Sequence, residues 1–478
     1  MAQDRHEKHG LLPAAAGEAR AETPAITCPI CRRDVAHASY LGPGDLAEDG
    51  DVVVLASANT PGWQPELGLC VDCRGRFATA RDYLHAHFPR LDRHPILPTA
   101  VRLGASDRYR GRGVSVAFLD AGYYAHPDLV EPEDRILAYV DVTNPRARRR
   151  DLERPDESSW HGMMTSVVAC GNGRLSGGAY RGLASEARLV LVKCGTARRV
   201  VHDDIRRGFE WVLRHRKRYG IRVINVSVGG DYEASYLKDG LSESVERCSR
   251  EGILVCAAVG NLGHLPRHPV LPPASAPSAL TVGGLDDKNR LAFAGYDMYH
   301  SSYGPTLDGL QKPELIAPGI WVAAPILPGT PAAAQAALIE RLDQAGDAEL
   351  PALLAGSAGI DPELHAATAG APGLIRAIVA KRVRDNNLIS GAYKHVDGTS
   401  FAAPIVASIA AQMLEANPDL TPPELRRILI DTARRLPHVA IERQGWGIVD
   451  AHNAVLRAVE LRSNARPAQR RGKRGALR

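Results

Sequence analysis

The amino-acid sequence predicts an α/β fold in which a mainly parallel sheet is covered by helices on both faces and is preceded by a small cysteine-bearing module. Short runs of β-branched and other apolar residues alternate with longer helical stretches, which is typical of parallel strands joined by crossover helices. The 478 residues, 45% of them hydrophobic, are enough for a large core and more than one domain. Two CxxC pairs, Cys28/Cys31 and Cys70/Cys73, precede the first predicted strand of the sheet.

Five apolar runs are expected to form strands of this sheet, with right-handed crossovers between them. They are residues 114–119, 188–193, 222–227, 253–258 and 279–283. The first run ends at Asp120, and α/β proteins build their sites at the carboxyl ends of such strands. Asp120 is therefore a candidate acid. His161, followed by Gly162 and an apolar stretch, is expected to open a helix and to face an acid on a neighbouring strand.

The stretch 397–404 reads Asp-Gly-Thr-Ser-Phe-Ala-Ala-Pro and leads into the apolar run 405–413, a predicted helix. Ser400 then lies at a helix N-terminus, where free backbone N–H groups and the positive end of the helix dipole stabilise a developing oxyanion. Asp120, His161 and Ser400 occur in the chain order of subtilisin, which differs from the orders of chymotrypsin and the α/β-hydrolases.

On these motifs the chain resembles the subtilisin-like serine proteases (the subtilase family) over roughly residues 97 to 460. Further segments that resemble the family are 224–230, 255–261, 312–319, 420–436 and 445–451. The resemblance implies a three-layer subtilisin-like domain that cleaves peptide bonds as an endopeptidase through an acyl-enzyme on Ser400. In that interpretation His161 is the general base, Asp120 orients it, and Asn261 supplies an oxyanion-hole amide.

The resemblance also implies an exposed strand edge that pairs with the substrate backbone and gives broad specificity. Its residues are Ser227, Val228, Gly229 and Gly230. Two positions depart from the family pattern, because Ala121 and Met163 stand where hydroxyl residues are usual. Each lost hydroxyl removes a potential supporting hydrogen bond. A second interpretation therefore stays open, a catalytically weak subtilisin-like scaffold that acts as a zinc-dependent binding protein.

The two CxxC pairs predict a structural zinc site formed by Cys28, Cys31, Cys70 and Cys73, because four thiolates complete a closed tetrahedral shell. Knuckle, hairpin, knuckle and helix resemble a zinc-ribbon or treble-clef module. The 38 residues between the pairs are expected to form a long loop. The module is expected to dock a protein partner or substrate, or to cover the cleft. The sequence does not indicate whether calcium is bound.

The predicted organisation has four parts. They are a disordered segment 1–25, the zinc module 26–95, the protease domain 96–460 with a helical insertion 331–385, and a basic disordered tail 461–478. The insertion is Ala- and Leu-rich, with helical periodicity in 334–342 and 374–383. It enters the chain just before the nucleophile segment, so it is either a peripheral helical pair or a regulatory lid.

The net charge of +5 comes from the tail, which holds seven Lys or Arg residues from Arg462 onward and no acid. Contact with nucleic acid through this tail is not favoured, because no aromatic residues are interleaved with the charges. The start of the sequence has no secretory signal pattern, and no apolar run is as long as a membrane span. We therefore expect a cytoplasmic protein with polypeptide substrates and no membrane contact, whose four remaining cysteines are buried free thiols.

Overall fold

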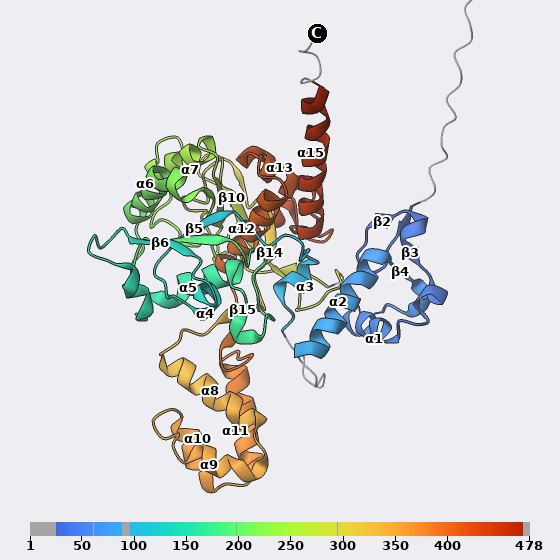
Figure 1. Ribbon diagram of the computed structural model, residues 1–478, viewed down its shortest axis with the longest axis vertical. Helices are drawn as coiled ribbons and strands as arrows, with labels where there is room; N and C mark the ends of the chain where they lie inside the picture. The colour runs from blue at the N-terminus through green and yellow to red at the C-terminus, as the bar shows by residue number, and fades with distance from the viewer. Residues whose placement is uncertain (1–24, 61, 88–95, 197, 294, 472–478) are drawn as a thin grey trace, which may run out of the picture.

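The computed structural model describes residues 25–60, 62–87, 96–196, 198–293 and 295–471. The disordered segment expected at residues 1–25 lies, except for residue 25, outside the described residues. Three parts are visible in Figure 1: a large α/β body, a small module formed by the N-terminal part of the described chain, and a group of helices that projects away from the body.

The body is built on a sheet with the strand order β11-β10-β9-β8-β5-β7-β6, and β14 also pairs with β10. All pairings are parallel except that of β10 with β11. The bounds are β5 Ser115–Asp120, β6 Ile136–Asp141, β7 Arg188–Lys193, β8 Ile221–Val226, β9 Leu254–Ala258, β10 Leu280–Asp286, β11 Asp297–Met298 and β14 Leu315–Pro318. The α/β fold with a mainly parallel sheet is thus confirmed, and β6, β11 and β14 join the five expected strands.

Three layers follow from the alternation of side chains along the strands. In β5, Val116 and Phe118 belong to one buried cluster, while Ala117 and Leu119 belong to another on the opposite face. The first cluster is closed by helices that include α5 (Ser159–Cys170), α12 (Thr399–Ala416) and α15 (Ala451–Arg471). The second is closed by α6 (His202–Tyr219) and α7 (Gly240–Arg250). Both faces of β5 are therefore buried, as in other parallel sheets.

Helix α12 is the core helix of the first layer and packs on β8, β9, β10 and β14 as well as on α5 and α15. Among the described helices it alone has the length and hydropathy of a membrane span, but 89% of it is buried within the fold. Its apolar character is thus accounted for by packing in the core. The short helices around the body are α3 Thr99–Leu103, α4 Pro127–Val130, α13 Pro422–Asp431 and α14 Ile441–Gln444, and the short strands β12 Gly304–Pro305 and β13 Gln311–Lys312 form a hairpin.

The cysteine module contains two small two-stranded sheets and two helices. Its elements are β1 Ile26–Thr27, β2 Asp34–Val35, β3 Tyr40–Leu41, α1 Gly50–Asn59, β4 Leu69–Cys70 and α2 Val71–His87. The prediction of a long loop between the CxxC pairs is wrong for residues 50–59, because they form α1. The β-branched residues of this run disfavour a helix, yet burial of Val52 and Ala56 against the module core stabilises it.

The module is held to the body by an ion pair, a hydrogen bond and a shared apolar core. Arg33, between the hairpin strands β1 and β2, pairs with Asp450 at the start of α15, and Arg434 donates to the carbonyl of Cys31. Apolar residues that follow the module in the chain complete its core: Leu97, Val101, Leu291 and Ala292.

A buried guanidinium connects this junction to the nucleophile segment. Arg102 in α3 donates two hydrogen bonds of 2.7 Å to Asp287, and the two side chains are 0% and 2% exposed. The same guanidinium donates to the carbonyls of Trp321 at 2.6 Å and Ile320 at 2.8 Å. Trp321 in turn donates its backbone N–H to Asp397 at 3.3 Å. Arg102 thus fixes the connection between β14 and β15 (Val322–Pro325), which supports the residues immediately before Ser400.

The helical insertion has a small core of its own. Its helices are α8 Pro331–Gln344, α9 Leu350–Leu354, α10 Pro362–Ala366 and α11 Pro372–Asp385. The two periodic runs expected in the sequence lie in α8 and α11, which pack on each other. The insertion leaves the body from β15 (Val322–Pro325) and returns through β16 (Tyr393–Val396), and these strands pair in antiparallel fashion.

The prediction of a disordered tail at 461–478 is wrong for residues 461–471, because α15 continues to Arg471. Four arginines and two alanines in this run have high helix propensity, whereas Pro467 inside the helix opposes it, and Gly472 follows the last helical residue. Residues 472–478 lie outside the described residues.

Replacing Arg102 by Met is expected to lower the free energy of unfolding by about 3–5 kcal/mol, because Asp287 would be left buried and unpaired. Urea unfolding followed by circular dichroism measures the change. Adding Asp287→Leu to this variant is expected to restore part of the loss. Arg427→Met, which removes an exposed pair with Asp431, is the matched control and should cost less than about 1 kcal/mol. Equal losses in the two single variants would contradict the role given to Arg102.

Candidate active site

Asp120 lies at the carboxyl end of β5 with its side chain fully buried. Its Oδ1 accepts hydrogen bonds from the backbone N–H of Ala121 at 2.7 Å and from His161 Nδ1 at 2.6 Å. Its Oδ2 accepts from the hydroxyl of Thr165 at 3.1 Å. Donors to both oxygens hold the carboxyl group in one orientation.

His161 lies in the first turn of α5, which approaches the end of β5 closely. The approach requires a glycine at position 162, because a Cβ there would lie 2.2 Å from the carbonyl oxygen of Gly122. Thr165 is one turn further along the helix, on the same face as His161, so it reaches the same carboxylate. The helix thus delivers both an imidazole and a hydroxyl to Asp120.

The pKa of His161 is raised above its usual 6.5. Burial acts to lower this pKa, but the charge of Asp120 and its hydrogen bond to Nδ1 outweigh that effect. With Nδ1 donating to Asp120, the neutral ring carries its lone pair on Nε2. An imidazole with a raised pKa is a stronger proton acceptor at neutral pH.

Ser400 lies in the first turn of α12, as the sequence motif predicts. Its hydroxyl donates to the carbonyl of Ser227 at 3.3 Å, and the hydroxyl of Ser227 donates to the carbonyl of Ser400 at 2.9 Å. The ring of His161 lies 6.0 Å from that of Phe401, the next residue. Among the described hydrogen bonds, none joins Ser400 to His161. Without a bound substrate, the distance between a catalytic serine and its base is often longer than a hydrogen bond.

The turn that leads into α12 depends on Gly398, whose φ of 143° is rarely adopted by residues with a side chain. Its backbone N–H donates to the carbonyl of Gly319 at 2.7 Å, which anchors the turn to the strand region fixed by Arg102. The nucleophile segment is therefore held by contacts of its own backbone.

Asn261 lies beside the same helix start. Its Oδ1 accepts from the backbone N–H of Thr399 at 3.0 Å and from the Thr399 hydroxyl at 2.8 Å. Because both partners are donors, the atom that meets them is the carbonyl oxygen of the amide, and the Nδ2 group remains as a donor. The amide nitrogen and the backbone N–H of Ser400 can then both serve an oxyanion.

The predicted substrate edge follows β8. Among the described hydrogen bonds, none involves the backbone of Val228 or Gly229, which leaves these groups for an added strand. Gly230 differs, since its N–H donates to the carbonyl of Pro272 at 2.7 Å. A Cβ at position 230 would lie 2.4 Å from the ring of His202, so this glycine serves packing. The free edge is thus shorter than the four residues predicted.

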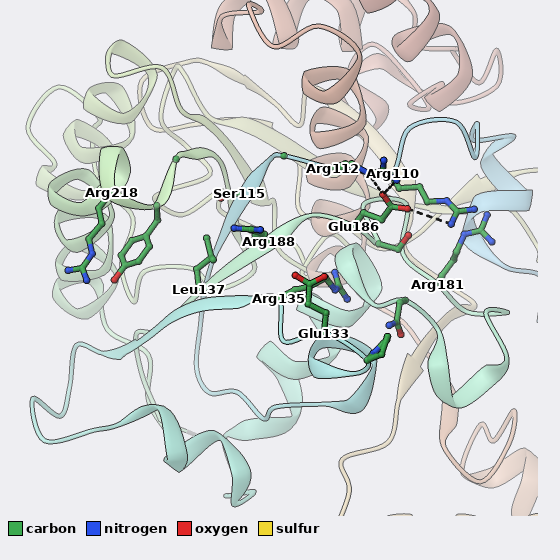
Figure 2. Close-up of a pocket in the computed structure, with 16 residues that line it drawn as sticks. Arg110, Arg112, Ser115, Glu133, Arg135, Leu137, Arg181, Glu186, Arg188 and Arg218 are labelled. Atoms are coloured by element: carbon green, nitrogen blue, oxygen red, sulfur yellow. Dashed lines mark hydrogen bonds and ion pairs between the residues drawn. The ribbon is translucent and has the colours of Figure 1, made fainter.

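A cavity of about 280 Å³ adjoins the candidate triad and the start of this edge. It is lined by His161 and Ala121 on one side, by Ser227 and Val228 on another, and by the turn that bears Arg199. A larger cavity of about 900 Å³ lies at the opposite end of the sheet and contains none of these residues (Figure 2).

Ala121 and Met163 stand where the family pattern has hydroxyl residues, and neighbouring groups take over different parts of what is lost. Met163 is fully buried in the main core, so its side chain contributes packing where the family pattern has a hydroxyl. Thr165 supplies a hydroxyl to Asp120 from the next turn of the helix. Sequence analysis missed Thr165, and its spacing of four residues from His161 is the signal that could have identified it. Thr399, which orients Asn261, was part of the recognised motif but received no role.

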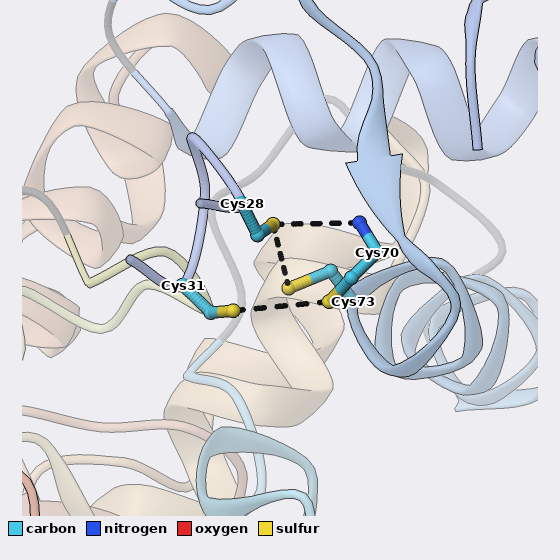
Figure 3. Close-up of side chains that lie close together, drawn as sticks. All are labelled: Cys28, Cys31, Cys70 and Cys73. Carbon is cyan, nitrogen blue, oxygen red and sulfur yellow. Dashed lines mark hydrogen bonds between the residues drawn. The ribbon is translucent and has the colours of Figure 1, made fainter. Parts of the chain in front are cut away.

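The second predicted site brings together the four cysteines of the module (Figure 3). Their sulfur atoms lie within 4.8 Å of one another, with 3.9 Å between Cys28 and Cys73 and 3.8 Å between Cys31 and Cys70. A zinc ion with Zn–S bonds of about 2.3 Å requires tetrahedral S···S edges of about 3.8 Å. Disulfide bonds are excluded at these distances, since they need about 2.05 Å. The backbone N–H of Cys70 also points to Cys28 Sγ at 3.4 Å.

The four-cysteine arrangement therefore fits a tetrahedral metal ion and not a pair of disulfides. The remaining cysteines, Cys170, Cys194, Cys248 and Cys256, are buried free thiols, as expected. Burial raises the pKa of Cys170 and of Cys248 to about 12, so neither is poised as a nucleophile.

Comparison with known proteins gives the family. A family model described as the subtilase family matches residues 111–447, more than half of the chain. The chain belongs to the subtilase family. This is the family of the subtilisin-type serine endopeptidases, and the matched range contains Asp120, His161, Asn261 and Ser400.

Among its relatives, the serine protease AprX of Bacillus subtilis is 29% identical over 358 residues, covering 72% of this chain and 66% of AprX. Subtilisin BL of Lederbergia lenta is 29% identical over 213 residues, 44% of this chain and 65% of that protein. Among solved structures, a protease of Pseudoalteromonas arctica aligns over 79% of this chain and 97% of that chain, with 23% identity and a TM-score of 0.49. The matches thus span about two thirds of these curated relatives.

Peptidase activity is expected to fall as the pH drops through the pKa of His161, because a protonated ring cannot accept the serine proton. Since that pKa is raised, the midpoint of the acid limb of kcat/KM should lie above 6.5. Asp120→Asn removes the negative charge that raises the pKa of His161, so the midpoint should move to lower pH. The rate should fall by about 10⁴-fold. Initial rates on a chromogenic peptide between about pH 5 and 9 test this. An unmoved midpoint in the variant would argue against the pairing.

Proposed function

We propose that the protein is an intracellular serine endopeptidase that cleaves peptide bonds through an acyl-enzyme on Ser400. The observation that carries this proposal is the contact of His161 Nδ1 with the buried Asp120 at 2.6 Å, beside a serine at the start of the central helix. Burying a carboxylate costs free energy unless its oxygens are paired, and here the pairing also orients and polarises the imidazole.

In the first step the Ser400 oxygen attacks the carbonyl carbon of the substrate, and its proton passes to Nε2 of His161. The imidazolium that forms is stabilised by Asp120. Collapse of the tetrahedral intermediate breaks the C–N bond, and His161 returns the proton to the leaving amine. Water then repeats the sequence on the ester, which releases the acid product and restores the Ser400 hydroxyl.

The negative charge of each tetrahedral intermediate is held by the Nδ2 group of Asn261 and the backbone N–H of Ser400. Thr399 locks the Asn261 amide in the orientation that this role needs. In subtilisin, the loss of one such donor costs about 10²–10³ in turnover. The fixed amide is preorganised, since no rotation is needed when the charge develops.

Polypeptides are the proposed substrates, bound as an added strand along Val228 and Gly229. Main-chain hydrogen bonds of this kind do not depend on the identity of the side chains, which supports broad specificity. The turn at Arg199 borders the cavity next to His161, so side chains of the substrate near the cleaved bond meet positive charge there.

We further propose that the four-cysteine module carries a structural zinc ion. Such an ion would neutralise part of the thiolate charge and crosslink the two CxxC segments, beside which the described strands are only two residues long. Reduced thiols are needed for this site, and all eight cysteines are free. Both facts support a cytoplasmic location, where thiols are kept reduced.

A fluorophosphonate probe is expected to label the wild-type chain at Ser400, and denatured casein is expected to be cut into fragments. Ser400→Ala should abolish labelling and lower cleavage by at least about 10³-fold. Ser408→Ala is a matched control, because this buried serine lies in the same helix and bonds only to the carbonyl of Ile405. Mass spectrometry of the labelled peptide and gel analysis give the readouts. A folded wild type that neither reacts nor cleaves would leave the scaffold interpretation.

Elemental analysis of protein purified under reducing conditions is expected to find about one zinc per chain and little iron. Cys70→Ser should lose most of the metal, because three thiolates remain. Cys256→Ser, at a buried thiol in β9, serves as the control and should retain it. A metal-free wild type, or equal metal content in both variants, would contradict the site.

A further inference from the structure

The cavity of about 900 Å³ lies at the end of the sheet opposite to the catalytic residues (Figure 2). It is bordered by the starts of β5 and β7, the end of α6 and the loop that precedes β5. Ser115 at the start of β5 lines it, whereas Asp120 ends the same strand. At about 3.3 Å per residue these two positions are about 17 Å apart, so the cavity is separate from the protease site.

Arginine dominates the lining. The charged residues are Arg110, Arg112, Arg135, Arg181, Arg188 and Arg218, with Glu133 and Glu186 as the acids. The lining residues alone carry an excess of four positive charges, which is reduced by Asp107, the partner of Arg181, and by Glu415, which accepts from the backbone N–H groups of Arg110 and Arg112. Figure 2 shows Arg188 and Arg218 on one side of the space and Arg110 and Arg112 on the other. Two groups of guanidinium donors thus face one concave space.

Half of these guanidinium groups already have close partners. Arg112 pairs with Glu186 at 2.7 Å, and Arg181 pairs with Asp107. Arg135 is buried and donates to the carbonyls of Asp128 at 2.6 Å and Ala187 at 3.1 Å. These three arginines shape the wall and have little donor capacity to spare.

The other three arginines retain donor capacity. Among the described residues, neither Arg188 nor Arg218 has an acidic partner, and Arg218 lies over the ring of Tyr219 at 5.2 Å. The Nε of Arg110 is buried without an acceptor, and its pair with Glu186 is 3.8 Å long, while Arg112 binds the same carboxylate more closely. Buried donors without a partner cost free energy, which an anionic ligand would recover.

We propose that this cavity binds a short oligophosphate chain. A guanidinium presents parallel N–H groups that match two phosphate oxygens, which makes arginine the preferred side chain for this anion. A chain of three phosphates carries about four negative charges, and Arg110, Arg188 and Arg218 would meet it with three guanidinium groups that have no close acidic partner among the described residues. The volume lies in the range of about 300–1,000 Å³ for small-ligand sites. A concave space of this size favours a compact ligand over a long polymer.

The phosphate chain has two sources, inorganic oligophosphate or a nucleotide. Tyr219 and Leu137 form an apolar wall at the end of the cavity that bears Arg218. A nucleobase would pack on Leu137 and on the part of the Tyr219 ring that Arg218 and Trp211 leave uncovered, while inorganic phosphate would gain nothing from this wall. Comparison of tripolyphosphate with a nucleoside triphosphate therefore separates the two sources.

The test uses the full chain as Ser400→Ala, which prevents self-cleavage, and titrates it with tripolyphosphate in a calorimeter. One site is expected. The double variant Arg188→Ala, Arg218→Ala should weaken binding by at least about tenfold, because it removes two charged donors to the anion. Arg146→Ala, Arg150→Ala removes the same charge from an exposed segment outside the cavity and should change affinity by less than about twofold.

Absence of binding at millimolar tripolyphosphate would overturn the proposal, and so would equal weakening in both double variants, which would indicate general charge attraction. Tighter binding of ATP than of tripolyphosphate, lost on Tyr219→Leu, would identify a nucleotide. Equal affinities that this variant leaves unchanged would identify inorganic oligophosphate. Because the readout is binding to an inactive chain, its result does not depend on the peptidase activity.

Discussion

The arrangement of the molecule depends on the buried guanidinium of Arg102, which makes four hydrogen bonds to described residues. It bonds Asp287 twice and caps the carbonyls of Ile320 and Trp321, while its own carbonyl accepts from Arg76 of the cysteine module. One buried residue thus contacts the module, the end of the sheet and the connection between β14 and β15. A charge is tolerated in this place only because its donors are occupied, so the geometry around it has little freedom.

The candidate active site follows the same principle, because hydrogen bonds from fixed donors hold its polar groups in place. Both oxygens of Asp120 have donors, and the carbonyl oxygen of Asn261 has two from Thr399. In contrast, Ser400 Oγ has only the carbonyl of Ser227 as a partner among the described groups, at 3.3 Å. The rigid groups are those that orient or stabilise, and the loosely held one is the group that must move during acyl transfer.

Much of this could be predicted from the sequence because the informative patterns are local. The apolar runs indicated five strands, and the spacing of the CxxC pairs anticipated a cluster that the fold assembles. Thr165 was missed because its role depends on how closely α5 approaches β5. Helix α1 was missed because packing overrides the low helix propensity of its valines, and the helical end of α15 was obscured by its charge. Arg102 carried no sequence signal, since its partners lie up to 219 residues away.

The pairing of β15 with β16 has a consequence for how this chain can vary. Register partners in neighbouring strands are about 5 Å apart, so the body offers two adjacent attachment points whatever the length of the segment between them. A domain of another size could therefore replace the insertion during evolution without displacing the catalytic residues. Because β16 leads directly into Asp397, any inserted domain is joined to Ser400 by only a few residues. A partner that binds such a domain could therefore change the position of the serine.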